Sequence, residues 1–382
     1  MKVIFEIQHL FDAEFRGVPL YTTTLIKTLY KRGNNQYALT FFDKDKQRNN
    51  KERYVDPLFG ELGIQYYECN ELSYQTIQKE FGVLPNKSYN EYTGAYGDIF
   101  HFTAPVFLPD KIHGKTVVTV HDMLPMQIPQ FWSENWQTVF ATSIERIETL
   151  DAIVITDSLS TKSDLLKLSR ISPDNTYVVY PGYDEGILYP DGDRTELYKL
   201  GIDVPYILYL AAIDPRKGID KILLAYEVLA SKYNDIKLVI AGSIKHADES
   251  LLAKIRSHAF TNRIITTDYV TEEQRRILMS NALVFLFPSL YEGFGLPVLE
   301  AMACGCPVIT SNNSSLPEVV GDAGVLIDAE SVEQLIYETD KLLTSETMRE
   351  GLRDKGIIRA KMFTWEKTAE ETEKIYDIAI RR

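Results

Sequence analysis

The residues best suited to chemistry gather in one segment of the sequence, "FPSLYEGFGLPVLEAMACGCPVITSNNSSLPEVVGDAGVLID", residues 287–328. Glu292 and Glu300 stand eight positions apart there, with two glycines and an expected helix start between them. Backbone amides and the positive end of the dipole make a helix start an anion site. A carboxylate accepts two hydrogen bonds from a pair of hydroxyls. Each glutamate alone is ordinary charge placement, but the combination favours a ligand with phosphate and hydroxyl groups.

Two adjacent cations form a second candidate cluster, Arg216 and Lys217 in "ILYLAAIDPRKGIDKILL". They stand in a turn between an expected strand and an expected helix, where a phosphate ligand would suit both charges. A surface turn that is basic by chance explains the same residues equally well.

A third cluster follows an apolar strand in "KTVVTVHDMLP", where His121 and Asp122 should lie at the strand's carboxyl end. Ligands bind at that edge of parallel sheets, which favours a functional reading of His121. Asp122 is expected to orient the loop or the imidazole ring. His101 also ends a strand, and a packed side chain is its favoured reading. Gly17 precedes the first expected helix in "FRGVPLY".

Two Asp-x-Asp strings raise the question of a metal, Asp43 with Asp45 and Asp191 with Asp193. Both lie in polar, turn-rich sequence where paired aspartates are common. Hard cations need several converging oxygen ligands. We therefore expect no metal site and no cofactor.

Short apolar strands alternate with amphipathic helices through the whole chain, which indicates an α/β protein with buried parallel sheets. The alternation occurs twice, so the sequence predicts two Rossmann-like domains facing a cleft. We expect a first domain over 1–185, a linker over 186–199, a second domain over 200–364 and a final helix over 365–382 that crosses back. Strands are expected at 3–7, 37–42, 98–102, 116–120, 152–156 and 177–180, then at 206–210, 237–241, 264–269, 283–288, 307–311 and 325–327. Helices are expected at 21–31, 136–150 and 162–168, and a capping box joins Thr271 to Gln274.

The composition narrows the function classes. The chain has 382 residues and a net charge of −13, which argues against nucleic acid as a partner. Three cysteines without a zinc-like spacing suggest a reducing, cytoplasmic setting. No apolar run is long enough to span a membrane, and the N-terminal run reads as a buried strand. Basic residues on the first helix, Lys27, Lys31 and Arg32, leave a peripheral membrane contact open.

The stretch "EGFGLPVLEA" resembles the E-x7-E signature of family 4 of the retaining glycosyltransferases. The downstream "CGCPVITSNNSSLPEVVGDAG", the junction "VVYPGYDEGILYP" and the last helix are similar to the family as well. This resemblance implies the GT-B fold, in which two Rossmann-like domains face an interdomain cleft. It also implies a nucleotide-diphosphate sugar donor, a glycan or lipid-linked acceptor, and work in bacterial cell-surface polysaccharide synthesis. The donor sugar, its base and the oligomeric state are not readable.

The resemblance also implies roles for single residues. Glu292 would contact the donor sugar, and Glu300 would bind the ribose hydroxyls. Arg216 and Lys217 would clamp the diphosphate, and His121 would lie near the reacting carbon. The remaining donor contacts implied are Gly17, Gly293, Phe294, Gly295 and Leu296. Many family members carry a further arginine where this sequence reads Ala211-Ala212, and Gly-Val-Pro replaces the usual glycine pair at Gly17.

Other functions remain to be weighed against a retaining, metal-independent hexosyltransferase. A sugar phosphorylase or a nucleotide-sugar epimerase could use the same architecture. A partner protein that binds a nucleotide sugar without catalysis is a further alternative. A nicotinamide-dependent dehydrogenase is disfavoured, because "QHLFDAEFRGVPLY" after the first strand lacks the G-x-G-x-x-G pattern.

Overall fold

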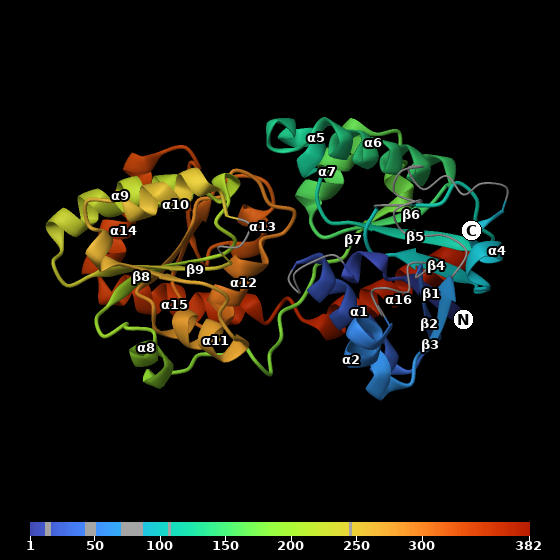
Figure 1. Cartoon of the computed structure of the whole chain (residues 1–382), viewed down its shortest axis with the longest axis horizontal. Helices are drawn as coiled ribbons and strands as arrows, with labels where there is room; N and C mark the ends of the chain where they lie inside the picture. The colour runs from blue at the N-terminus through green and yellow to red at the C-terminus, as the bar shows by residue number, and fades with distance from the viewer. Residues whose placement is uncertain (12–16, 43–50, 70–86, 106–107, 244–246) are drawn as a thin grey trace. The chain divides into compact units, whose positions relative to one another are not determined.

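A computed structural model of the chain describes residues 1–11, 17–42, 51–69, 87–105, 108–243 and 247–382. The chain divides into two compact units (Figure 1). The first unit is Met1–Gly182 with Trp365–Arg382, and the second is Tyr183–Thr364. Residues 186–199, expected as a linker, are counted with the second unit and contain the short helix α8 (Thr195–Lys199).

The first unit is built on a parallel sheet, because its strands are apolar runs buried on both faces. In the described residues the sheet has seven strands in the order β3-β2-β1-β4-β5-β6-β7. The strands are β1 (Lys2–Glu6), β2 (Gln36–Phe42), β3 (Gln65–Cys69), β4 (Ile99–Phe102), β5 (Lys115–Val120), β6 (Ile153–Thr156) and β7 (Thr176–Val178).

Helices cover both faces of this sheet (Figure 1). One apolar cluster joins the sheet to α1 and the last helix, α16, and another joins it to α6 and α7. Arg32 of α1 donates to Glu373 of α16 over 2.9 Å. The helices are α1 (Val18–Arg32), α2 (Asp56–Phe59), α4 (Tyr89–Thr93), α5 (Leu124–Gln127), α6 (Glu134–Thr149), α7 (Leu159–Leu168) and α16 (Trp365–Arg381); short turns are η1 (Gln8–Leu10), η3 (Lys51–Val55), η4 (Gly60–Leu62), η5 (Pro129–Phe131) and η6 (Pro173–Asn175).

The second unit repeats the design with a sheet of six parallel strands, in the order β10-β9-β8-β11-β12-β13 over its described residues. Helices α9, α10 and α14 lie on one side of the sheet, and α11, α12 and α15 lie on the other (Figure 1). The strands are β8 (Tyr206–Leu210), β9 (Lys237–Ala241), β10 (Ile264–Thr267), β11 (Val284–Phe287), β12 (Val308–Ser311) and β13 (Val325–Ile327). Beside α8, the helices are α9 (Ile219–Lys232), α10 (Glu249–Arg256), α11 (Glu272–Asn281), α12 (Leu296–Ala303), α13 (Leu316–Val320), α14 (Val332–Thr344) and α15 (Glu346–Ala360), with turns η7 (Pro215–Lys217) and η8 (Thr261–Arg263).

These elements confirm the predicted α/β architecture with parallel sheets. Every predicted strand is present with ends within two residues of those expected. The capping box of Thr271 and Gln274 is present at the start of α11. Strand β3 was not predicted, because its sequence "QYYEC" leaves the first four side chains partly or fully exposed at the sheet edge. Helix α1 begins three residues before the expected start, since Gly17 caps it and Pro19 fits its first turn.

Each sheet has one point at which the strand order reverses. In the first unit that point lies between β1 and β4, and in the second between β8 and β11. Open parallel sheets bind ligands in the crevice outside the carboxyl ends of the two strands at such a point. The loops after these four strands are therefore where functional side chains are to be sought.

Membrane insertion through a helix has no candidate in the part of the chain that the structure describes. Over those residues, no helix combines the length and the apolar character that a membrane crossing requires.

Candidate active site

The turn after β8 is packed directly against the end of β11. Gly218 caps α9 with φ of 71°, a left-handed conformation that glycine adopts without a side-chain penalty. A Cβ atom on Gly218 would lie 2.2 Å from the carbonyl oxygen of Pro288. The hydroxyl of Ser289 also lies 3.2 Å from the carbonyl oxygen of Arg216. The segments that follow β8 and β11, at the reversal point of the second sheet, are thus in direct contact.

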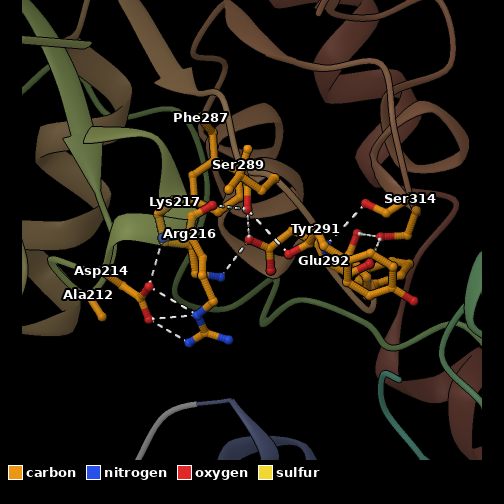
Figure 2. A network of polar contacts seen from close by, with 12 residues as sticks. Ala212, Asp214, Arg216, Lys217, Phe287, Ser289, Tyr291, Glu292 and Ser314 are labelled. Carbon is orange, nitrogen blue, oxygen red and sulfur yellow. Dashed lines mark hydrogen bonds and ion pairs between the residues drawn. The ribbon is translucent and has the colours of Figure 1, made fainter. Parts of the chain in front are cut away.

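An ion pair bridges these two strand ends. Lys217 Nζ lies 2.5 Å from Glu292 Oε1, and the Ser289 hydroxyl donates to the same oxygen over 2.6 Å (Figure 2). Glu292 is buried, and the Lys217 ammonium also lies 5.4 Å from the centre of the Phe287 ring. Among the described contacts of Glu292, none involves Oε2, so one carboxylate oxygen remains to accept hydrogen bonds from a ligand.

The second cation of the turn is held by its own carboxylate. Arg216 Nε lies 3.0 Å from both oxygens of Asp214, and Nη2 lies 2.5 Å from Oδ2 (Figure 2). Burial raises the pKa of Asp214, but the hydrogen bonds and charge of Arg216 outweigh burial and hold that pKa below its usual value. The Arg216–Asp214 ion pair therefore stays charged, and it fixes the guanidinium of Arg216 at the end of β8.

The loop that carries Glu292 is fixed by two serines from the segment after β12. The backbone N–H of Glu292 donates to the Ser314 hydroxyl over 3.0 Å (Figure 2). The Ser315 hydroxyl lies 3.0 Å from the carbonyl oxygen of Glu292 and 2.8 Å from that of Phe294. These contacts hold the glycine-rich loop rigid ahead of α12.

Helix α12 begins at Leu296, with Gly295 as its cap at φ of 102°. A Cβ atom on Gly295 would lie 2.7 Å from Leu316 Cδ2, so only glycine fits here. Pro297 occupies the first turn of the helix. The N–H groups of a helix's first turn have no partner within the helix. The start of α12 at Leu296 can thus present amides and a positive dipole to an anion.

Glu300 lies one turn further along α12 and is held by an arginine of α11. Arg275 Nη1 donates to Glu300 Oε1 over 2.9 Å, and both side chains are buried. Arg275 Nη2 also lies 3.3 Å from Glu272 Oε1. The pair fixes the orientation of the Glu300 carboxylate on α12.

The two cysteines after α12 are buried free thiols. Burial raises the pKa of Cys304 to about 12. Burial likewise raises the pKa of Cys306. Both thiols are therefore protonated at neutral pH, which removes them as nucleophiles.

His121 lies in the first unit at the carboxyl end of β5, and both its ring nitrogens are engaged. Nδ1 lies 2.7 Å from Asp157 Oδ2, and Nε2 lies 2.7 Å from the carbonyl oxygen of Thr103. Both partners accept hydrogen bonds, which favours the imidazolium. Burial lowers the pKa of His121, but the charge and hydrogen bond of Asp157 outweigh it and the pKa is raised. The rings of His121 and Tyr21 also pack in a T-shaped arrangement, with their centres 4.7 Å apart.

The other predicted residues of the first unit have plainer surroundings. Gly17 caps α1 with φ of 63°, and nothing lies within 4 Å of a Cβ placed on it. Asp122 accepts the N–H of Leu124 and so orients the turn into α5, as expected. His101 is fully buried between Tyr376 and Thr119. Burial lowers the pKa of His101 to about 3, which leaves it a neutral packing residue.

The Asp-x-Asp strings differ in what the structure says of them. Asp43 and Asp45 lie outside the described residues. Asp191 pairs with Arg276 over 3.0 Å, and Asp193 accepts the N–H and the hydroxyl of Thr195 at the start of α8. Both described aspartates thus have protein partners.

The structure brings together most of the predicted residues of the second unit, and it adds supporting residues that were not predicted. Lys217 and Glu292 meet directly, while Gly293, Gly295 and Glu300 follow in the loop and helix behind them. The residues missed are Ser289, Ser314, Ser315, Arg275 and Asp157. Asp157 and Ser289 follow apolar strands, a signal that could have found them; Arg275 has no such signal.

Comparisons with known proteins show what this chain resembles. Residues 196–359 match the model of the family described as glycosyl transferases group 1. The chain is 29% identical over 293 residues to the O-antigen chain mannosyltransferase B of Escherichia coli, an alignment covering 74% of this chain and 75% of that one. It spans about a third of the length of further Escherichia coli mannosyltransferases that it matches.

Solved structures share the whole architecture. Sucrose-phosphate synthase from Thermosynechococcus elongatus superposes with a TM-score of 0.78 at 21% identity, covering 98% of each chain. The Anabaena protein HepE in complex with UDP-glucose superposes with a TM-score of 0.73 at 16% identity, again covering 98% of each chain. These likenesses establish the fold. The second unit is thus similar to the glycosyl transferases group 1 family over residues 196–359, and the chain is a glycosyltransferase of the GT-B fold.

Proposed function

We propose that this chain is a retaining hexosyltransferase that needs no metal ion. It would move a sugar from a nucleotide-diphosphate donor to a glycan or lipid-linked acceptor, in the synthesis of a bacterial surface polysaccharide. The observation that carries the proposal is the Lys217–Glu292 ion pair across the reversal point of the second sheet.

Donor binding follows from the chemistry gathered around that pair. Lys217 and Arg216 supply positive charge for the diphosphate, and the start of α12 adds amides and a dipole. Glu292 has an oxygen to spare for the sugar hydroxyls, and Glu300 suits the ribose diol. The solved structure of HepE, which shares this fold, is a complex with UDP-glucose, and this supports a nucleotide sugar as the donor here.

In the structure both cations are neutralised, Lys217 by Glu292 and Arg216 by Asp214. A diphosphate brings two or more negative charges and would draw the Lys217 ammonium away from Glu292. The displaced carboxylate would then be ready to accept hydrogen bonds from the sugar. Donor binding and release of Glu292 are coupled in this proposal.

The chemical step cleaves the bond between the anomeric carbon and the diphosphate oxygen. Negative charge grows on that oxygen, and prepositioned donors stabilise it most effectively. Lys217, Arg216 and the α12 amides supply these donors, which is why we propose that no metal is required. The acceptor hydroxyl attacks the anomeric carbon, and its proton passes to the leaving diphosphate on the same face.

Retention is proposed because the acceptor attacks the anomeric carbon from the same face that the diphosphate leaves. Double displacement would also retain the configuration, but it is the less favoured route here. Double displacement needs a carboxylate free to attack the anomeric carbon. Once Lys217 turns to the diphosphate, the Ser289 hydroxyl still donates to Glu292 Oε1, which suits Glu292 as an acceptor of hydrogen bonds. The catalytic role predicted for His121 also stays a proposal. Because both its ring nitrogens are engaged, a fixed positive charge suits it better than a general base.

The acceptor and the setting are proposals drawn from the relatives. O-antigen chain mannosyltransferase B suggests a mannose donor and a surface glycan as acceptor. The buried free thiols fit a reducing compartment such as the cytoplasm. A peripheral contact with a membrane would bring a lipid-linked acceptor within reach.

The test is a transfer assay with GDP-mannose, UDP-glucose, UDP-galactose and UDP-N-acetylglucosamine, with glycan acceptors and no divalent cation. We expect one donor to give product with the donor's anomeric configuration by ¹H NMR, in the presence of EDTA. An inverted product would remove the claim of retention, and activity that depends on added Mg²⁺ would remove the claim of metal independence. Cleavage of a disaccharide by phosphate would instead identify a phosphorylase.

A further inference from the structure

The first unit has a reversal point of its own, and its polar side chains are not used by the proposed donor site. Glu6 ends β1 and pairs in register with Phe102, the last residue of β4. Thr103 follows directly, and His9 lies in the turn η1 after β1. Crevices at such points bind ligands in open parallel sheets. The placement alone therefore marks Glu6, His9 and Thr103 as candidates to meet a ligand.

A network of hydrogen bonds connects His9 and Thr103 with Thr22 of α1. His9 Nε2 lies 2.9 Å from the hydroxyl of Thr22 on α1 and 3.4 Å from the hydroxyl of Thr103. The two threonine hydroxyls are 2.8 Å apart. The carbonyl of Thr103 accepts the Nε2–H of His121. His9 is thus held in one orientation by neighbours from α1 and β4, and it adjoins the residue that holds His121.

Two groups of this cluster have hydrogen-bonding capacity that their neighbours do not use. Glu6 is buried, and its Oε1 accepts the backbone N–H of Gln8 over 2.7 Å. Its Oε2 lies 3.7 Å from His9 Nδ1, a separation too long for a hydrogen bond. Within the described residues, His9 Nδ1 is buried and has no hydrogen-bond partner. Buried polar groups of this kind are almost always bonded, which indicates that a ligand completes the set.

The polar groups of Glu6, His9 and the two threonines indicate which class of ligand would bind. A carboxylate oxygen, an imidazole nitrogen and threonine hydroxyls can accept and donate to hydroxyl groups. Neither Glu6 nor His9 contacts a lysine or an arginine in the part of the chain that the structure describes. A phosphate would be repelled by the Glu6 carboxylate, whereas an uncharged sugar ring would satisfy both open groups.

We propose that Glu6 and His9 form the sugar-reading pair of an acceptor site at the β1–β4 crevice. Glu6 Oε2 accepts a hydrogen bond from one ring hydroxyl of the acceptor sugar, and His9 Nδ1 bonds a neighbouring hydroxyl. This inference rests on the proposed function, because it names the acceptor residues of that transferase. Binding of a neutral sugar here is nevertheless separable from nucleotide binding in the second unit.

The test is saturation-transfer NMR of the full chain with four neutral probes, the methyl α-glycosides of mannose, glucose, galactose and N-acetylglucosamine. The variants are Glu6→Gln and His9→Gln, both close in size to the native side chains. Asp98→Asn is the matched control, since Asp98 is a carboxylate at the opposite edge of the same sheet, bonded to the N–H of Lys2. Melting curves with and without UDP and GDP report the fold and the donor site separately.

We expect at least one glycoside to bind the wild-type chain, and each crevice variant to weaken that binding by about tenfold or more. Asp98→Asn should bind the glycoside as the wild type does, and all variants should keep the nucleotide-induced shift in Tm. If Glu6→Gln does not fold, His9→Gln alone decides the outcome. Equal binding in both folded variants, or no glycoside binding to the wild type, would overturn the inference. Glycoside binding without any nucleotide shift would leave it standing and count against the proposed donor site.

Discussion

Both units have a parallel sheet whose strand order reverses at one point, but different kinds of side chain gather at the two reversal points. At the reversal point of the second sheet, Lys217 and Glu292 form a charged bridge, and Arg216 is forked to Asp214. At the reversal point of the first sheet, His9 is joined to threonine hydroxyls, and Glu6 has no lysine or arginine among its described contacts. One edge is rich in paired charge, and the other is rich in hydroxyl and imidazole groups.

The difference indicates that the fold positions a site at the same point of each sheet, whereas the residues of the loops determine which ligand that site binds. Paired charges that can be exchanged suit a diphosphate, which brings its own charge to the site. Hydroxyl and imidazole groups suit a neutral sugar, whose recognition depends on the direction of hydrogen bonds. The following substitutions test whether the two reversal points differ in packing, in charge and in the ligands that they bind.

The largest effect is expected from Gly17 and Gly218, which cap the first α-helix after the first strand of each sheet. Gly218→Ala should lower the free energy of unfolding by more than about 4 kcal/mol, because its Cβ would meet the Pro288 carbonyl oxygen at 2.2 Å. Gly17→Ala meets no atom within 4 Å and should cost only the backbone strain, about 1–3 kcal/mol. Urea denaturation of both variants checks this. Equal losses would show that the two edges are packed alike.

The next effect is on catalysis. Lys217→Ala should lower kcat/KM by about 10²–10³-fold, since one donor to the leaving diphosphate is lost. Lys232→Ala is the matched control, because Lys232 is an exposed lysine of the same unit whose ion pair with Asp340 lies at the surface. Steady-state kinetics measure kcat/KM, on variants whose melting curves match that of the wild type. Unchanged kcat/KM in Lys217→Ala would remove the lysine from the diphosphate site.

A smaller effect is expected from the carboxylate on α12. Glu300→Gln should weaken nucleotide affinity by about tenfold while kcat changes less, because the ribose contact is made in both ground and transition states. Glu272→Gln removes the other carboxylate beside Arg275 and is the control. Calorimetric titration with the cognate nucleoside diphosphate measures both. If the two variants bind alike, the ribose role of Glu300 is wrong.

The smallest effect is a pH dependence confined to the first unit. The pKa of His121 is raised in the folded chain, chiefly by Asp157 acting against burial. The pair therefore contributes full stability below the unfolded pKa of about 6.5, and this contribution is lost as pH rises through the folded pKa. The difference in unfolding free energy between wild type and His121→Gln should shrink as pH rises from 5 to 9 in this ~4-unit window. A difference that grows with pH would mean that His121 is neutral at low pH.

Most of the fold was predictable because buried parallel strands appear in sequence as short apolar runs. The strand Tyr206–Leu210, "YILYL", is completely buried and has the bounds expected of it. Strand β3 escaped because an edge strand with exposed tyrosines has no such run. The terminal helix α16 belongs with the first unit through tertiary contacts, such as the bond between Tyr376 and His101.

The candidate site was predictable only in part. Lys217 and Glu292 were identified by their types and by the motif around them, but not as partners of each other. Their contact spans 75 positions and depends on how β8 and β11 pair. Arg275 reaches Glu300 from another helix, and nothing in its local sequence indicates this. The hydrogen-bond partners of a site are set by tertiary packing, which residue spacing does not encode.

The most direct measurement is calorimetric titration of the wild-type chain and of Lys217→Ala with UDP, GDP, ADP and thymidine diphosphate and with the matching monophosphates. We predict that one diphosphate binds the wild type at least about tenfold more tightly than its monophosphate, and that Lys217→Ala removes most of this preference. Equal affinity for the diphosphate and the monophosphate in the wild type, or a preference that survives in Lys217→Ala, would contradict a diphosphate site between β8 and α12.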